Sequence, residues 1–357
     1  MPEVLFENRR AAQIENDRLR VTVLVEGGHV AEILHKPTGV NPLWIPPWPS
    51  IEPSSYDRAR HPEYGDDAES KLLAGIMGHN VCLDLFGGPS LEEAAAGMTV
   101  HGEASILPYQ IEAGPQRLVQ RTTLPSAHLA FEREIRLAPG QDAVVFRETV
   151  ENLDATDRPI AWTQHVTLGP PFLRKGETRF AVPATRSRVY ELDFAGECGF
   201  MQPGAEFDWP LVPLKDGGRE DLRTYTGRPA SGGFTTHLMD PARRQASFLA
   251  FTSGAGLLFG YVWERQDFPW LGIWEENHCR QRPPWNGQTL TRGMEFGVSP
   301  MPESRRQMIE RNNLFGVSAY RWLPAKSRLS VSYCAFLTTA GNLPSEVTWY
   351  GETIGFQ

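Results

Sequence analysis

The stretch His128-Leu-Ala-Phe-Glu-Arg-Glu-Ile-Arg-Leu137 alternates apolar and polar residues along most of its length. Successive side chains of an extended strand point to opposite faces, so a period of two predicts a strand that buries one face. The apolar side consists of Leu129, Phe131, Ile135 and Leu137. This pattern predicts a strand of a sheet that packs one face on a hydrophobic core.

Other segments on both sides of this stretch show the same alternation or are short apolar runs bounded by turn residues. They are predicted as strands: Arg20–Glu26, Val144–Glu151, Pro159–Leu168, Gln245–Thr252, Gly256–Trp263 and Leu329–Ala335. Two hairpins are expected. One turns at Ser253-Gly254-Ala255, and the other joins Val144–Glu151 to Pro159–Leu168 through residues 152–157.

Helix signals are few. Ser90-Leu91-Glu92-Glu93 has the pattern of a capping box, with Gly97 as a terminator, and Glu303–Arg311 is a second short candidate. The 357 residues include 33 Gly and 29 Pro, which together exceed the roughly 12% of average usage and argue against a helix-rich fold. We therefore predict an all-β protein, a large antiparallel β-sandwich with a few short helices, forming a single domain over residues 1–357.

Composition excludes several classes of partner and cofactor. Lys and Arg total 35 against 43 Asp and Glu, without a basic block, so no nucleic-acid partner is expected. No apolar run approaches the roughly 20 residues of a membrane span, and the first residues lack an export signal, so a cytoplasmic protein without membrane association is expected. The cysteines are widely spaced and no His-x-His pair occurs, so we expect no disulfide framework, metal or other cofactor.

One long segment does not fit the strand pattern. Asn41–Asp67 holds six prolines together with the aromatic residues Trp44, Trp48, Tyr56 and Tyr64. Long connections are uncommon and usually functional or disordered. Since exposed aromatic rings are costly, we expect an ordered loop that packs over one end of the sandwich and borders a cleft. Plain surface packing without a role in a cleft is the alternative.

Three segments carry histidines in unusual surroundings: Gly78–Gly88 with His79, Val100–Ala104 with His101, and Trp162–His165. Histidine titrates near neutral pH and can donate or accept a proton, so several in one cleft would suit acid–base chemistry. Taken singly, each such histidine is more often a hydrogen-bonded structural residue than a functional one.

The order of these segments resembles the aldose 1-epimerase (galactose mutarotase-like) superfamily from about Arg20 to Phe336. Gly78–Gly88 is similar to the corresponding region of the hexose-6-phosphate mutarotase branch, and His101-Gly102 follows it as in that family. The later matching segments are Glu151-Asn152-Leu153 with Thr163-Gln164-His165, Trp270–Trp274 and Gly293-Met294-Glu295-Phe296-Gly297.

The resemblance implies an isomerase that interconverts the α and β anomers of a hexose or related sugar. Glu295 would remove the proton of the anomeric hydroxyl and His165 would protonate the ring oxygen, without a metal or cofactor. It also implies that the residues contacting the sugar are His101, Trp274, His79, Asn80 and Glu103. The partner would be a small-molecule carbohydrate, bound by a monomer or homodimer.

Two departures from the family keep other functions open. The family's arginine is replaced in Lys71-Leu72-Leu73-Ala74-Gly75, and its Asp-His pair in the segment Gly232–His237. Arg58, Arg60 or Arg280 could compensate from loops. One alternative is a carbohydrate-binding protein without turnover. Another is hydrolase or lyase chemistry, in which Glu275, Glu276 or Glu103 joins Glu295 as a second carboxylate.

Overall fold

The computed structural model describes residues 4–192 and 195–357. Within these residues two large sheets account for most strands, and their neighbouring strands are antiparallel. The eleven-stranded sheet has the order β1 (Val4–Phe6), β2 (Arg9–Glu15), β3 (Leu19–Leu24), β4 (Val30–His35), β5 (His79–Leu83), β11 (Trp162–Leu168), β21 (Leu290–Gly297), β20 (Trp270–Asn277), β17 (Ser231–Met239), β13 (Ala184–Val189) and β14 (Glu206–Asp208). The eight-stranded sheet has the order β12 (Arg179–Ala181), β18 (Gln245–Thr252), β19 (Leu257–Glu264), β25 (Arg328–Thr339), β9 (Ala143–Asn152), β8 (Leu129–Leu137), β7 (Arg117–Leu124) and β6 (Gln110–Ala113).

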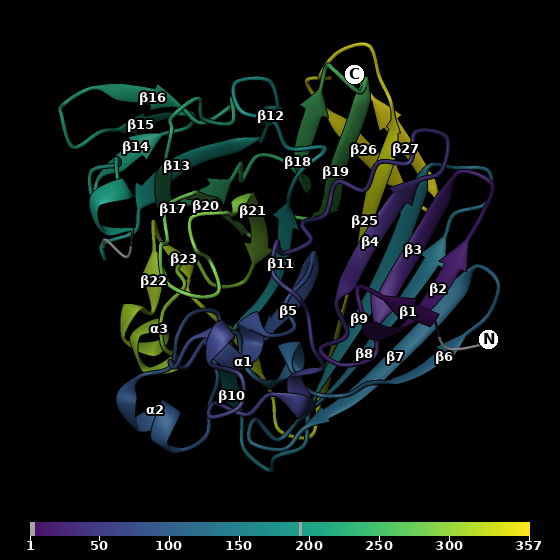
Figure 1. The fold of residues 1–357 in the computed structure, drawn as a ribbon, viewed down its shortest axis with the longest axis vertical. Helices are drawn as coiled ribbons and strands as arrows, with labels where there is room; N and C mark the ends of the chain where they lie inside the picture. The colour runs from purple at the N-terminus through teal and green to yellow at the C-terminus, as the bar shows by residue number, and fades with distance from the viewer. Residues whose placement is uncertain (1–3, 193–194) are drawn as a thin grey trace.

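The described chain also contains four two-stranded sheets: β10 (Arg158–Ile160) with β24 (Arg321–Leu323), β15 (Leu211–Pro213) with β16 (Arg219–Asp221), β22 (Asn313–Leu314) with β23 (Val317–Ser318), and β26 (Val347–Tyr350) with β27 (Thr353–Phe356). The α-helices of the described chain are α1 (Ser70–Leu73), α2 (Leu91–Ala95) and α3 (Arg305–Arg311), which Figure 1 shows at the lower left. None of these helices has the length and apolar character needed to cross a membrane. The prediction of an all-β sandwich with a few short helices is confirmed.

Both predicted helices begin at a capping box. The Ser90 hydroxyl accepts a hydrogen bond from the backbone N–H of Glu93, whose carboxylate accepts one from the Ser90 N–H. Ser304 and Gln307 form the same reciprocal pair at the start of α3. Each box satisfies two backbone donors that a helix N-terminus leaves without intrahelical partners.

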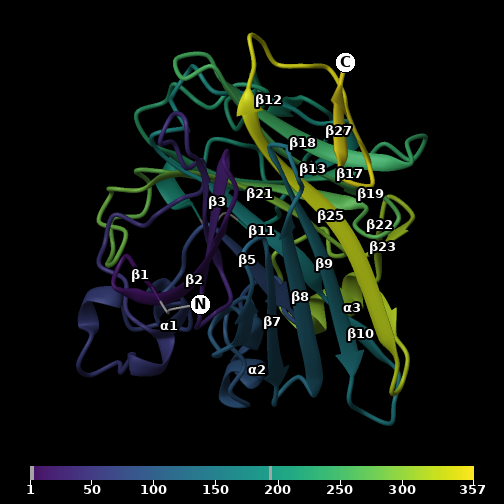
Figure 2. The ribbon, with the colours of Figure 1, turned by 90° about the vertical axis from the view of Figure 1, so that its right-hand side faces the viewer.

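The alternation of residues 128–137 is reproduced in the burial of β8. Its alternate residues from Leu129 to Leu137 are buried, and the residues between them are partly exposed. Figure 2 shows β7, β8, β9 and β25 side by side in the eight-stranded sheet. One charged residue, Arg133, lies on the buried face among the apolar ones and is 0% exposed.

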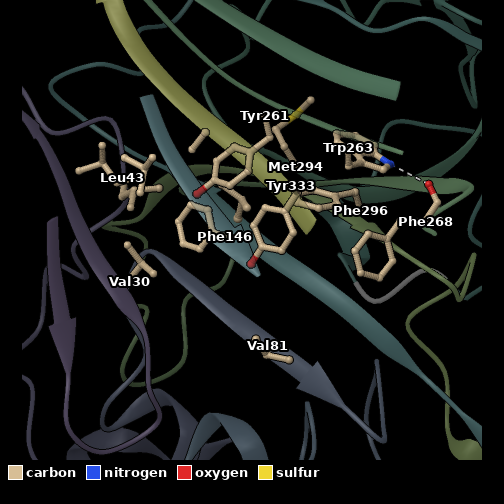
Figure 3. Close-up of a cluster of buried hydrophobic side chains, with 14 of the residues drawn as sticks. Val30, Leu43, Val81, Phe146, Tyr261, Trp263, Phe268, Met294, Phe296 and Tyr333 are labelled. Carbon is tan, nitrogen blue, oxygen red and sulfur yellow. Dashed lines mark hydrogen bonds between the residues drawn. The ribbon is translucent and has the colours of Figure 1, made fainter. Parts of the chain in front are cut away.

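Aromatic residues from both sheets form the core between them. Figure 3 shows Phe146 and Tyr333 of the eight-stranded sheet near Met294 and Phe296 of the eleven-stranded one. The rings of Phe146 and Tyr333 stack with centroids 4.8 Å apart. Across the sheets, Trp263 stacks on Phe296 at 4.2 Å. Stacked and edge-to-face rings stabilise a core beyond the area they bury.

A buried polar network also joins the two sheets. Glu148 of β9 accepts hydrogen bonds from Arg133 Nε at 2.6 Å and from Tyr333 Oη at 2.7 Å. Its other oxygen accepts from Gln164 Nε2 and from Trp162 Nε1 at 2.6 and 2.9 Å. Because Trp162 and Gln164 belong to β11, this carboxylate links the sheets and balances the charge of Arg133.

The hairpin predicted from Val144–Glu151 and Pro159–Leu168 is wrong. Strand β9 pairs with β8 and β25, whereas β11 pairs with β5 and β21 in the opposite sheet. The second segment is also divided, since the short β10 pairs with β24. Strand β11 is buried on both faces, so its sequence has no apolar–polar alternation that would indicate which sheet it joins.

Candidate functional site

A pocket of about 260 Å³ opens on the face of the eleven-stranded sheet that is turned away from the core. It is lined by Glu69, Leu72, Leu73, Ile76, Phe86, Gly87, Gly88, Val100, His101, His165, Tyr190, Leu192, Phe234, Trp274, Arg280, Trp285, Glu295 and Pro302. Four of the residues predicted to catalyse the reaction or contact the sugar are among them: His101, His165, Trp274 and Glu295. These four come from segments far apart in the chain.

Strand register brings His165 and Glu295 together. His165 of β11 is paired directly with Glu295 of β21, so their side chains stand next to each other on one face of the sheet. The His165 Nε2 atom lies 3.1 Å from Glu295 Oε1. This contact lacks hydrogen-bond alignment, and within the described residues Glu295 Oε1 has no hydrogen-bond partner. The Nδ1 atom of His165 lies 3.0 Å from the Thr167 hydroxyl.

His101 is held beside this pair by its own backbone and by Asn80. Its backbone N–H donates to Gly87 O, and its carbonyl accepts from the Leu83 N–H, both at 3.2 Å. The Asn80 Nδ2 atom lies 3.3 Å from His101 Nδ1. The rings of His101 and His165 lie 4.6 Å apart.

Burial governs the ionisation of these groups. Loss of solvent raises the pKa of the Glu295 carboxyl group well above its usual range and lowers the pKa of His165 to about 4. The pKa of His101 is also held well below its usual range, by burial first and by the nearby His165 second. Burial therefore favours a carboxylic acid beside an uncharged imidazole, a pair with one proton to give and one position to accept it.

Aromatic and charged side chains complete the pocket. The ring of Trp274 lies 5.9 Å from that of His165 and 6.0 Å from that of Trp285. The Arg280 guanidinium lies 4.7 Å from the centre of the Trp285 ring and makes ion pairs of 3.5 Å with Glu69 and with Glu276.

Three predicted sugar contacts lie outside the pocket lining. His79 is fully buried between the sheets, where Tyr261 Oη and Gln164 Oε1 lie 3.0 and 2.9 Å from its ring nitrogens. The reason is the alternation of β5: Asn80 is paired with His165 and shares its face, so His79 must point the other way, into the core. Asn80 lies behind His101, and Glu103 accepts a hydrogen bond from the backbone N–H of Ala127 at 2.9 Å.

Most of the side chains that could replace the family's arginine or supply a second carboxylate lie outside the pocket. Arg58 and Arg60 are exposed and do not line the pocket, whereas Arg280 does. Glu275 is 3.0 Å from Arg292, and Glu276 accepts from the backbone N–H groups of residues 279 and 280. Neither lines the pocket, so the arrangement does not offer the second carboxylate from these positions.

The proline-rich segment 41–67 packs behind the pocket instead of lining it. Trp44 is buried and stacks on Trp285 with ring centroids 6.1 Å apart, and Trp48 Nε1 donates to the carbonyl of Leu73 at 2.8 Å. The loop is packed as predicted, but its expected place at the border of the cleft is taken by residues 69–76.

Sequence reasoning missed much of the pocket wall, including Leu72, Ile76, Phe86, Phe234 and Trp285. The only available signal was the apolar Leu72-Leu73 pair at the place of the family's arginine. Isolated apolar residues in turns and short helices have no spacing that distinguishes a pocket wall from ordinary core.

No family model and no curated protein sequence matches the chain. Among solved structures, a Klebsiella pneumoniae protein named "putative aldose 1-epimerase" is 17% identical, with a TM-score of 0.67 over 94% of this chain and 80% of the other. Galactose mutarotase-like proteins from Clostridium acetobutylicum and Lactobacillus casei are 12% and 13% identical, with TM-scores of 0.62 and 0.58. Those two matches cover 95% and 92% of this chain and 98% and 100% of the other chains. The chain therefore has the fold of the aldose 1-epimerase (galactose mutarotase-like) superfamily.

Proposed function

We propose that the protein catalyses the exchange of α and β anomers of a sugar at the His165–Glu295 pair. The observation that carries the proposal is the 3.1 Å approach of an imidazole and a carboxyl group in a buried pocket. Anomer exchange removes one proton from the anomeric hydroxyl and adds one to the ring oxygen, so it needs an acid and a base at the same time.

In the proposed reaction, Glu295 accepts the proton of the anomeric hydroxyl while His165 protonates the ring oxygen. The bond between C1 and the ring oxygen breaks, C1 rotates in the open-chain aldehyde, and ring closure returns both protons. The starting form is the carboxylate with imidazolium, and it differs from the uncharged pair only by transfer of one proton between the two groups. Burial favours the uncharged pair, which is the form required beside the open-chain sugar.

His101 is proposed to donate a hydrogen bond from Nε2 to a sugar oxygen, and Trp274 to pack against the C–H face of the ring. The cytoplasm is the proposed location and a monomer or homodimer the proposed state, both from the sequence. We also propose that the chain forms a single domain, as its sequence predicts.

The test is the rate of anomer exchange, measured by NMR exchange spectroscopy or polarimetry on common aldoses and corrected for spontaneous exchange. Since a positioned acid or base supplies about 10²–10⁴-fold, Glu295→Gln and His165→Gln should each lose that factor in kcat/KM. Glu132→Gln makes the same chemical change on β8, far from the pocket, and should retain the wild-type rate.

Equal rates for wild type and Glu295→Gln on every sugar would reject the catalytic assignment. Calorimetric binding of a sugar that the wild-type protein does not anomerise would instead favour the alternative of a carbohydrate-binding protein.

A further inference from the structure

The polar and apolar side chains of the pocket are unevenly distributed. His165 and Glu295 are buried, and the partly buried His101 joins them to form the polar group of the pocket. Much of the remaining wall is aliphatic or aromatic and comes from α1 and the turns and strands around it: Leu72, Leu73, Ile76, Phe86, Phe234 and Trp285.

The other charged side chains of the lining are already engaged with each other. Arg280 Nη1 lies 3.5 Å from Glu69 Oε2, and the same guanidinium lies over Trp285. Glu69 and Arg280 are 29% and 17% exposed at their side chains, against 6% and 2% for His165 and Glu295. The charged pair is thus the more solvent-exposed part of the pocket, and a phosphate bound beside Arg280 would meet the Glu69 carboxylate.

This distribution disfavours a fully hydroxylated sugar. An unmodified hexopyranose carries hydroxyl groups around the whole ring, and each one that leaves water for an aliphatic or aromatic wall loses hydrogen bonds without replacement. A deoxy position, or an oxygen capped by an alkyl group, would gain from the same contact. At C1 the requirement is reversed, because a free hydroxyl must reach the polar group.

We propose that the substrate is a reducing sugar with a free anomeric hydroxyl whose other ring substituents are largely apolar, as in deoxy or O-alkylated sugars. This inference rests on the proposed anomer exchange at His165 and Glu295. The polar group takes the anomeric centre, and the wall formed by α1, Phe234 and Trp285 takes the apolar substituents.

The experiment compares D-glucose, 6-deoxy-D-glucose and 2,3,4,6-tetra-O-methyl-D-glucose, with the corresponding galactose series in parallel. Exchange rates are measured by NMR, and binding is measured separately through quenching of tryptophan fluorescence. In at least one series, kcat/KM and affinity should rise at least tenfold from the parent sugar to a modified one. A gain already present in the 6-deoxy sugar assigns the apolar contact to C6, and a gain only in the methylated sugar assigns it to the ring oxygens.

A polar substitution in the apolar wall tests whether that wall causes the preference for the modified sugar. Ile76→Thr should shrink the preference for the modified sugar, mainly through KM, while Ile111→Thr on the edge strand β6 should leave it unchanged. Exchange that is equally fast or faster on the parent sugar in both series overturns the inference and leaves the proposed function intact. Tighter binding of the modified sugar without any exchange has the opposite meaning: it supports the apolar pocket and rejects catalysis.

Discussion

Glu295 depends on a glycine two residues earlier in its own strand. A Cβ atom at position 293 would lie 2.3 Å from Glu295 Oε1 and 3.2 Å from the Cβ of Trp274. Residues 293 and 295 share one face of β21, so the missing side chain at 293 leaves the space that the carboxyl group occupies.

We therefore predict that Gly293→Ala displaces the Glu295 carboxyl group and lowers kcat/KM for anomer exchange by about 10²-fold, the cost of a misplacement of about 1 Å. The protein should stay folded, because the atom that must move is the end of a side chain. Exchange rates and thermal unfolding curves would be compared with those of Gly114→Ala, where the nearest atom lies at 3.6 Å and nothing is crowded. A wild-type rate in Gly293→Ala would contradict this account of the site.

At the scale of strands, β8, β9 and β11 are joined by the network around Glu148. Arg133 and Glu148 are both 0% exposed, and Gln164 of β11 contacts both. His165 is the next residue of β11 and lies on the opposite face. The network therefore anchors, on the core side, the strand that carries the pocket histidine on the other side.

Removing either Arg133 or Glu148 alone should lower the free energy of unfolding. We expect Glu148→Leu to lower the free energy of unfolding by about 3–5 kcal/mol, because it leaves the Arg133 charge buried without its partner. The double variant Arg133→Met with Glu148→Leu should recover much of that loss, since no unpaired charge remains. Urea unfolding measures both. Glu134→Leu, in the more exposed ion pair with Arg117, should change stability by about 1 kcal/mol or less. If the double variant loses as much unfolding free energy as the Glu148→Leu and Arg133→Met single variants lose together, the unpaired charge is not the cause of the loss.

For the whole molecule, buried histidines couple folding to pH. His237 is 0% exposed, with the Ser187 and Thr235 hydroxyls 2.8 and 2.9 Å from its ring nitrogens. Burial, assisted by Arg292, lowers the pKa of His237 to about 3. Between these two pKa values the histidine of the unfolded chain, with a pKa near 6.5, binds a proton, whereas His237 of the folded protein stays unprotonated. Stability falls for this reason as the pH drops from about 6.5 toward 3.

The prediction is a difference in pH slope. Between pH 6.5 and pH 5, wild type should lose about 1.6 kcal/mol more unfolding free energy than His237→Gln, because the slope rises from about half of 1.4 kcal/mol per pH unit at pH 6.5 to nearly the full value at pH 5. Chemical denaturation at each pH measures this, and the same comparison at pH 8 gives the packing cost of the substitution alone. Parallel slopes for the two proteins would mean that His237 takes up its proton in the folded state.

Local patterns determined what depends on neighbours in the chain. The period of two in residues 128–137 determined which face of β8 is buried, and the spacing of Ser90 and Glu93 determined the start of α2. Both follow from backbone geometry within a few residues. The order of short segments also pointed to the superfamily fold and to His101, His165, Trp274 and Glu295, which line one pocket.

Only the tertiary structure decided the relations between distant segments. The sheet to which β11 belongs and the placement of His79 in the core depend on contacts between distant segments: His165 pairs with Glu295, and His79 contacts Tyr261 and Gln164. The apolar pocket wall was assembled in the same way from separate segments. Alternation indicates which side chains of a strand share a face, but it does not indicate which other segment packs against that face. A strand that is buried on both faces could belong to either sheet without a change in its pattern.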